Sequence, residues 1–322
     1  MKRIFLTYDN LAKQDGIGAQ IQRILAIYSI SKKLRFNYVH SEILHTIEER
    51  AHNASSQSDL NSLIADVNSV FTFSSAQPPS TAREFKIYNL GRRELLKVVL
   101  RTYLRRETCV IKICLPFGLI EQYPDWYEYA GKAMRESSFF TNIPVRDEIV
   151  VHIRYGYKPI EGTNKGSSPR FLPLEYYPKA VSEIFETEKL SPSFPIVIQT
   201  DIPEAQGTWK PFQEERLNEL QDIGYETNNQ AFAFESIDLR NEYFQEFPNV
   251  TVRYCDPFLD AIKEMSNSRY LLMSRSSFSY IAGVINPNKV FIPRLHGHAK
   301  LKRWFWDFPE GKEIKIDLLS GI

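Results

Sequence analysis

The chain has 322 residues, which is enough for two domains of ordinary size. Hydrophobic residues make up 43% of it and aromatic residues 13%, a composition that fills cores and excludes general disorder. A formal net charge of +1 gives no general electrostatic basis for binding nucleic acid or a membrane.

Strand and helix patterns alternate along the first half of the chain. The patterns predict strands at residues 3–7, 36–39 and 110–115. They predict helices at residues 17–34, 59–67, 94–104 and 124–135. The polar, proline-bearing segment 141–147 is the predicted boundary between a first domain, residues 1–145, and a second, residues 146–322.

A second series of strands and helices follows that boundary. Strands are predicted at residues 149–153, 196–199, 250–254, 270–273 and 290–292. Helices are predicted at residues 257–265 and 278–285. Alternating strands and helices are typical of the α/β class, with parallel sheets that carry helices on both faces. Each half therefore reads as an α/β domain with a parallel sheet.

Cysteine usage and the N-terminus both indicate the cytosol. The cysteines, Cys109, Cys114 and Cys255, are odd in number and lack metal-ligand spacing, which favours reduced thiols. Residues 1–9 turn polar too early for a signal peptide, and no stretch has the apolar length that spans a bilayer. Basic residues within 92–106 predict a solvated helix face and leave room for peripheral contact with a membrane or an anionic glycan.

The most informative segment is residues 148–157. It predicts a buried strand whose end places His152 and Arg154 on one side, because they are two residues apart. Arginine offers a fixed fork of donors and histidine one more, and ligands of open α/β sheets sit beyond the carboxyl ends of strands. These features favour a phosphate site. An ion pair of the two side chains with surface carboxylates explains the segment equally well.

Two other segments lie between a predicted strand and a predicted helix. In the first, Gly16 and Gly18 let the backbone approach an anion at a helix N-terminus, although ordinary packing also explains such a start. The third glycine of the dinucleotide fingerprint is missing. In the second, Arg275 and four serines exceed what a helix cap requires, which favours a phosphate or sugar-diphosphate site. The serines are Ser274, Ser276, Ser277 and Ser279.

Acidic residues near these turns form no pattern that calls for a metal. They are Asp9, Asp15, Glu161, Glu175, Asp201 and Asp256. The chain has no D-x-D pair at a strand end, no H-E-x-x-H and no Cys/His cluster. It also lacks a serine-hydrolase elbow and a G-K-[ST] phosphate loop. Most of these carboxylates are expected at the surface or in helix caps.

Three segments, in this order, resemble motifs of the fucosyltransferase superfamily, which holds the α1,2-, α1,6- and protein O-fucosyltransferases. Gly16-Ile-Gly-Ala-Gln20 and the helix after it are similar to the G-x-G-N-Q segment. His152-Ile-Arg-Tyr-Gly156 is similar to the H-x-R-R-G-D motif. Residues 273–283, Met-Ser-Arg-Ser-Ser-Phe-Ser-Tyr-Ile-Ala-Gly, resemble the N-S-S-F-S-W-W-G region of the α1,2 enzymes.

The resemblance implies a GT-B fold, in which two Rossmann-like domains face each other across a cleft and a last helix can return to the first domain. It implies inverting transfer of fucose from GDP-fucose to a glycan, with no metal and no other cofactor. The expected catalytic residues are Arg154 and His152 at the diphosphate, with Glu161 or Asp15 as base. The expected donor-binding residues are Gly16, Gly18, Gln20, Arg154, Ser274, Ser276, Ser277, Ser279 and Asp256.

Several positions depart from the family's motifs. Ala19 stands where the family has Asn, and Tyr155 and Tyr157 stand where it has the second Arg and the Asp. Tyr280 and Ile281 replace the two tryptophans. Without the Asn and the Asp, the identity of the donor and the activation of the acceptor stay open.

The sequence thus predicts a cytosolic, inverting, metal-independent glycosyltransferase that uses GDP-fucose, in a bacterial-type setting where it builds surface polysaccharide or lipid-linked glycan. One alternative is the same fold with another GDP- or UDP-linked sugar. A second is a nucleotide- or glycan-binding protein without catalysis. A third is pyruvyl transfer from phosphoenolpyruvate on a similar scaffold.

Overall fold

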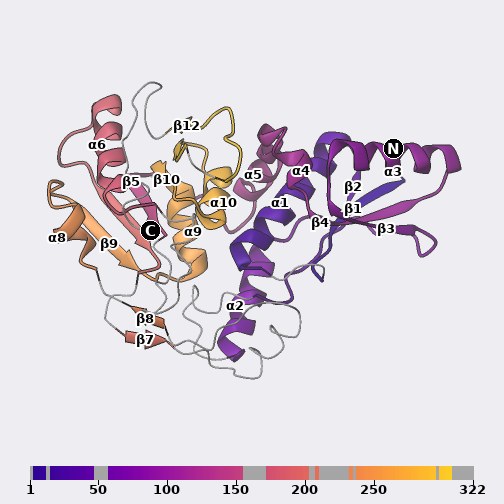
Figure 1. Ribbon diagram of the computed structural model, residues 1–322, viewed down its shortest axis with the longest axis horizontal. Helices are drawn as coiled ribbons and strands as arrows, with labels where there is room; N and C mark the ends of the chain where they lie inside the picture. Colours follow the sequence, from indigo (N-terminus) through magenta and orange to yellow (C-terminus); the bar gives the residue numbers. More distant parts are fainter. Residues whose placement is uncertain are drawn as a thin grey trace, which may run out of the picture.

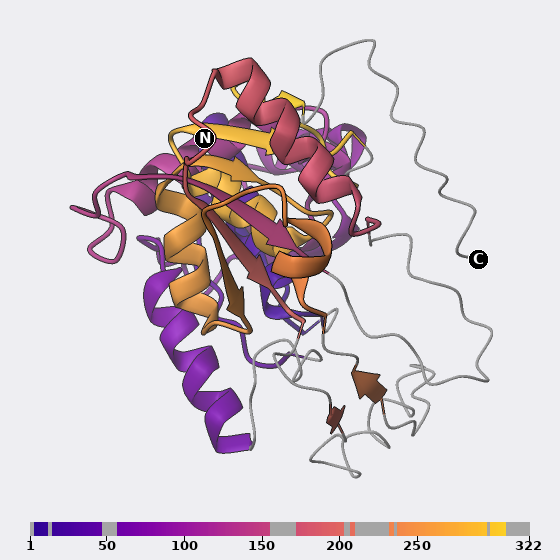
Figure 2. The same ribbon diagram turned by 90° about the vertical axis from the view of Figure 1, so that its left-hand side faces the viewer.

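The computed structural model describes residues 3–11, 15–46, 57–154, 172–202, 237–294 and 297–306, and the backbone of 207–209 and 232–234. Their strands form a four-stranded sheet, a six-stranded sheet and a two-stranded pair (Figures 1 and 2). Every strand pairing in the two larger sheets is parallel. The predicted α/β class with two parallel sheets is therefore confirmed.

The first sheet has the order β2-β1-β4-β3. Its strands are β1 (Ile4–Tyr8), β2 (Asn37–Tyr38), β3 (Arg83–Asn89) and β4 (Cys109–Leu115). The helices of this half are α1 (Ile17–Leu34), α2 (Gln57–Val70), α3 (Arg92–Arg105), α4 (Phe117–Ile120), the 3-10 helix η2 (Pro124–Tyr127) and α5 (Glu128–Arg135). β1 and β4 are central and almost wholly apolar, and β3 is an exposed edge strand.

The second sheet has the order β12-β11-β10-β5-β6-β9. Its strands are β5 (Arg146–Ile153), β6 (Ile196–Thr200), β9 (Val250–Tyr254), β10 (Ser268–Leu272), β11 (Lys289–Ile292) and β12 (Phe305–Trp306). Its helices are α6 (Tyr176–Glu188), α8 (Leu239–Tyr243), α9 (Phe258–Asn267) and α10 (Ser277–Ile285). β7 (Gly207–Trp209) and β8 (Phe232–Phe234) form the antiparallel pair.

Helices from both halves fill the space between the two sheets (Figure 1). α1 and α5 cover the first sheet, α9 and α10 cover the second, and one hydrophobic core runs through all four helices. α5 approaches α10 so closely that a Cβ at Gly131 would lie 2.3 Å from the Val284 carbonyl oxygen. Arg135 donates from Nη1 to the Ile285 carbonyl at 3.0 Å, which places a cation at the C-terminal end of α10.

A second hydrophobic core lies on the opposite face of the six-stranded sheet. α6 contributes Tyr177, Val181 and Ile184 to it, and each is no more than 1% exposed. The strand residues Ile149 and Val151 point into this core, whereas Val150 belongs to the core between the sheets. β5 is therefore apolar on both faces, as expected of a central parallel strand.

Some predictions fall on residues that the structure does not describe. They are Glu161, the motif positions Tyr155 and Tyr157, and the expected last helix beyond residue 306. Among the helices that the structure does describe, none combines the length and the apolar character needed to cross a membrane.

Candidate functional site

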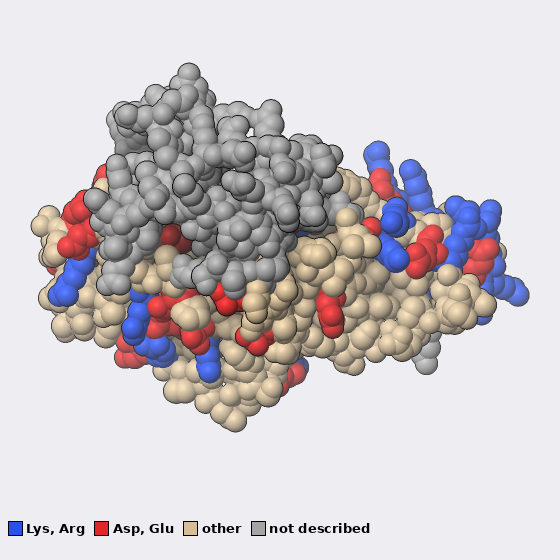
Figure 3. Space-filling model, turned by 90° about the horizontal axis from the view of Figure 1, so that it is seen from below, with Lys and Arg blue, Asp and Glu red and all other residues tan. Residues whose placement is uncertain are grey.

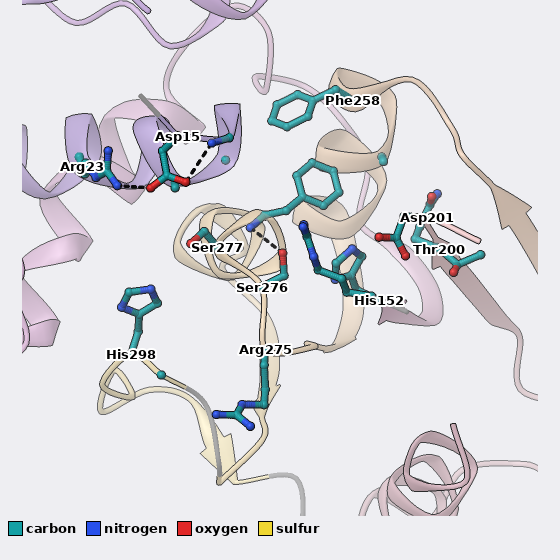
Figure 4. A pocket seen from close by; sticks show the side chains of 18 of the residues that line it. Asp15, Arg23, His152, Thr200, Asp201, Phe258, Arg275, Ser276, Ser277 and His298 are labelled. Carbon is teal, nitrogen blue, oxygen red and sulfur yellow. Dashed lines mark hydrogen bonds and ion pairs between the residues drawn. The ribbon is translucent and has the colours of Figure 1, made fainter. Parts of the chain in front are cut away.

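A pocket of about 400 Å³ lies between the two halves of the chain, at the carboxyl ends of their strands (Figure 4). Leu115 ends β4 and lines the pocket from the first half. His152 of β5 and Thr200 of β6 line it from the second half. Two parallel sheets that meet at such a pocket have the arrangement predicted as a GT-B fold, and ligands of open α/β sheets bind at this edge.

The N-terminal ends of α1 and α10 meet at this pocket. A Cβ added to Gly18 would lie 3.3 Å from the backbone nitrogen of Phe278, so the first turns of the two helices are in direct contact. Ser276 caps α10 by accepting the Phe278 N–H at 3.2 Å, whereas α1 has no side-chain cap. Two helix N-termini therefore direct partial positive charge toward one space.

Two arginine side chains add full positive charge to the lining of the same pocket. Arg154 follows β5 directly, Arg275 precedes α10, and both line the pocket. Burial lowers the pKa of Arg275 from its ordinary value. Its Nε is buried and has no hydrogen-bond partner among the described residues. A buried donor of this kind is usually satisfied by a ligand or water, so the pocket is suited to an anion.

His152 enters the pocket as a neutral ring. Its side chain is 4% exposed, and burial together with the nearby charge of Arg154 lowers its pKa to about 3. Nδ1 lies 2.7 Å from the Ser274 Oγ. When the Ser274 hydroxyl donates to Nδ1, the single proton of the neutral ring is on Nε2. His152 can then donate one hydrogen bond but supplies no charge.

The four predicted serines divide into two pairs. Ser276 and Ser277 line the pocket, and their contact with a donor stays a prediction. Ser274 and Ser279 are at most 1% exposed and are not part of its lining. Ser279 donates to the Ser276 carbonyl at 3.2 Å, and Ser274 contacts His152. The buried pair therefore supports the turn and the imidazole behind the pocket wall, which differs from the predicted donor contact.

The segment before α1 also differs from prediction in part. Gly16 and Gly18 line the pocket, but the Gln20 amide is 1% exposed and donates to the Asp15 carbonyl at 2.7 Å and the His45 carbonyl at 2.6 Å. Gln20 therefore holds this loop in place. The space that a side chain at Gly18 would occupy is taken by α10.

Asp15 has a structural role in addition to its place in the pocket. Its carboxylate accepts hydrogen bonds from the Gly16 N–H at 3.0 Å and from Arg23, with which it forms an ion pair. Arg23 is 2% exposed and also donates to the Tyr8 hydroxyl at 3.2 Å. A buried guanidinium requires such a partner. The assignment of Asp15 or Glu161 as base stays a prediction.

Carboxylates line the pocket at the ends of β6 and β9, beside the end of β5 that carries His152 and Arg154. Asp201 and Asp256 lie there, and Asp256 accepts from the Gln199 amide at 3.1 Å. Cys255, between these strand ends, has a φ of 52° and donates its N–H to the Thr200 carbonyl at 2.9 Å. No group of three or more potential metal ligands occurs among the described residues.

Sequence reasoning did not assign His298 to the pocket. This histidine lines the pocket and places Nδ1 2.7 Å from Oε1 of Glu121, a residue of the first half. The same carboxylate accepts the Ala299 N–H. The partners are 177 positions apart, so no local pattern could have indicated the contact.

Comparison with known proteins gave coarse likenesses in structure. No family model matches the sequence, and no match was found among curated proteins. The structure of E. coli heptosyltransferase WaaC with ADP-2-deoxy-2-fluoro heptose is 10% identical, with 94% of this chain and 92% of that chain covered and a TM-score of 0.37. POFUT1 in complex with GDP-fucose is 9% identical, with 94% and 98% covered and a TM-score of 0.41. NodZ alpha-1,6-fucosyltransferase soaked with GDP-fucose is 11% identical, with 89% and 94% covered and a TM-score of 0.32. The functional argument therefore depends on the pocket.

Proposed function

We propose that this protein is an inverting glycosyltransferase that transfers a sugar, with GDP-fucose as the donor, to a hydroxyl of a glycan. The observation that supports this most directly is the meeting of two helix N-termini and two arginines, Arg154 and Arg275, in one pocket. A nucleoside diphosphate is an anionic leaving group that such a wall can stabilise. The three motif segments supply the choice of fucose and of GDP.

The proposed reaction is a single displacement. The acceptor hydroxyl attacks the anomeric carbon of the donor, the bond from that carbon to the phosphate oxygen breaks, and its electron pair moves to the diphosphate. The hydroxyl proton passes to a carboxylate base, for which Asp15 and Glu161 are the candidates. Charge develops on the leaving oxygen, where Arg154 and the first turn of α10 act.

His152 contributes to this step as an oriented donor. Because its ring is neutral, its Nε2–H can donate to a diphosphate oxygen without repelling the adjacent Arg154. The Ser274 hydroxyl fixes the ring from the other side at 2.7 Å. The carboxylates of Asp201 and Asp256, which follow β6 and β9, are suited to hydroxyl and base N–H donors of the nucleoside or sugar.

Metal independence is part of the proposal. The cationic groups already at the pocket can take the place that a divalent ion occupies in other diphosphate sites. The proposal therefore expects full turnover in the presence of a chelator. Loss of turnover on chelation, with recovery on adding a divalent metal, would contradict this part.

Ligand-induced thermal stabilisation of the purified protein is the first test. GDP, UDP, GDP-fucose and phosphoenolpyruvate are compared in the presence of a chelator, and a ligand at about 100 times its Kd adds about 2.7 kcal/mol to the stability. We expect GDP and GDP-fucose to raise the melting temperature. A response to UDP or phosphoenolpyruvate alone would refute the fucosyl donor, and binding without release of GDP from any donor would refute catalysis.

A further inference from the structure

The outer helix α3 carries an exposed row of large apolar side chains. Leu96, Leu100, Tyr103 and Leu104 are 56%, 59%, 80% and 70% exposed, and they lie on one face because they are three or four positions apart. Only Leu95 and Thr102 of this helix are buried. Four of the eleven exposed large hydrophobic residues in the described part of the chain thus occur on one helix.

Basic side chains flank this apolar row. Arg93, Lys97, Arg101 and Arg105 repeat every four residues, so they form a second row beside the first. Arg101 is half-buried with its guanidinium carbon 5.3 Å from the centre of the Phe85 ring, whereas the other three are exposed. α3 contains one acidic residue, Glu94, in its first turn.

This charge is concentrated at one end of the molecule. The whole chain has a formal charge of +1, yet α3 alone carries five basic residues and one acidic residue. α3 lies on the outer side of the first sheet, away from the second sheet (Figure 1). Figure 3 shows many Lys and Arg side chains at the same end, with some Asp and Glu side chains among them. The apolar row therefore lies in a locally cationic surface.

We propose that α3 docks on the surface of an anionic phospholipid bilayer, with its axis in the plane of the membrane. Leucine and tyrosine side chains enter the boundary between headgroups and acyl chains, and the flanking Arg and Lys side chains contact the lipid phosphates. The proposal does not depend on the activity at the pocket.

The charge pattern favours a membrane over a second copy of the chain. An antiparallel twofold dimer through α3 would place the basic row of one copy against that of the other, and like charges at an interface are unfavourable. An anionic bilayer offers both an apolar layer for the leucines and phosphates for the cations. It therefore accommodates both rows of α3 at once.

The position of α3 relates the docked surface to the pocket. The Leu90 N–H, just before α3, donates to the Leu115 carbonyl at 2.8 Å, and Leu115 lines the pocket. The N-terminal end of α3 is thus at the pocket edge of the first sheet.

Sedimentation with vesicles tests the proposal on the 322-residue chain. We expect the protein to sediment with vesicles of phosphatidylcholine and phosphatidylglycerol, to do so much less with phosphatidylcholine alone, and to be released by salt. Each exposed cation contributes about a fivefold change in partitioning near an anionic surface, so Arg93→Gln with Lys97→Gln should weaken binding about 25-fold. Leu100→Ser with Leu104→Ser should weaken it about tenfold for each leucine that enters the interface.

Matched variants separate this surface from general effects of charge and apolarity. Lys33→Gln with Lys132→Gln removes the same charge from exposed positions elsewhere, and Leu11→Ser with Leu44→Ser removes two other exposed leucines. Both controls should bind vesicles as the wild type does. Unchanged melting temperatures would show that all variants fold, as their exposure leads us to expect.

Several results would overturn the proposal. The wild-type protein could stay in the supernatant with anionic vesicles. The α3 variants could bind vesicles as well as the wild type does, or the control variants could lose as much binding as the α3 variants. A concentration-dependent dimer that the leucine substitutions dissociate, without vesicle binding, would instead assign α3 to self-association. Light scattering during size-exclusion chromatography detects that outcome.

Discussion

Lowering the pH from about 7 to about 5 is expected to destabilise the protein through His152. In the unfolded chain this histidine titrates near its ordinary pKa of 6.5, whereas burial and the charge of Arg154 hold its pKa in the folded protein at about 3. Between these two values the unfolded state binds more protons. Stability contributed by the neutral ring is therefore complete above pH 6.5 and is lost as the pH falls toward 3.

The size of this effect follows from proton linkage. At about pH 5 the folded ring is still neutral while the unfolded ring is almost fully protonated, which lowers the free energy of unfolding by about 2 kcal/mol relative to neutral pH. For a domain of this size the loss corresponds to about 4–8 °C in melting temperature. The size of this loss depends mainly on the pKa of His152 in the unfolded chain, because its pKa in the folded protein is well below 5.

The assay compares the pH dependence of melting in the wild type and two variants. His152→Gln keeps a polar partner for Ser274 but cannot titrate, so its melting temperature should fall less between pH 7 and 5, by about the amount given above. Met265→Leu changes another fully buried residue and should keep the wild-type pH dependence. A His152→Gln variant with the wild-type slope would refute the assignment of a neutral, buried ring.

Three further substitutions test the site and the interface. Arg154→Ala should nearly abolish turnover while leaving the melting temperature unchanged, as measured by GDP release and circular dichroism; near-normal activity would contradict the role of this arginine. Ser274→Ala should lower the melting temperature, because it leaves Nδ1 of His152 without its partner at a cost of about 1–3 kcal/mol. It should also lower kcat/KM. A variant with the wild-type melting temperature and the wild-type kcat/KM would exclude a positioning role for Ser274. Gly131→Ala should cost about 1–3 kcal/mol of stability, because its Cβ would lie 2.3 Å from the Val284 carbonyl oxygen, and an unchanged melting temperature would show that α5 and α10 separate easily.

The sequence was sufficient to predict most of the regular elements around the pocket. Helical spacing of apolar residues predicted α1 with its observed bounds, and an apolar run ending before Asp256 did the same for β9. β3 was missed because it is an edge strand whose residues are mostly exposed and charged. α6 was missed because its start, Tyr-Tyr-Pro, gives no helical signal until the residues after it are considered. The formation of β3 and of α6 therefore depends on tertiary contacts more than on local sequence preference.

The candidate site could be predicted only where the spacing of residues along the sequence determines on which side of an element a side chain lies. A pair two apart at a strand end is expected to share a side, and His152 and Arg154 both line the pocket, while their contact with a diphosphate stays a prediction. Which serines of a strand-to-helix turn face outward depends on the packing of that turn, and the sequence did not separate Ser276 and Ser277 from the buried pair. The Glu121–His298 contact joins the two halves and has no local signal at all.

The departures from the family motifs gain a physical meaning from the contact between α1 and α10. Gly18 is retained, and its missing side chain lets the first turn of α1 meet the backbone of Phe278. A larger residue there would separate the two helix N-termini and weaken their combined attraction for an anion. Ala19, where the family has Asn, lines the pocket without a polar group. The proposed diphosphate site therefore keeps the close approach of the two helix N-termini and lacks the polar group of the family's Asn. The first measurement should therefore compare the binding of GDP with the binding of UDP. It is more decisive than a search for the acceptor.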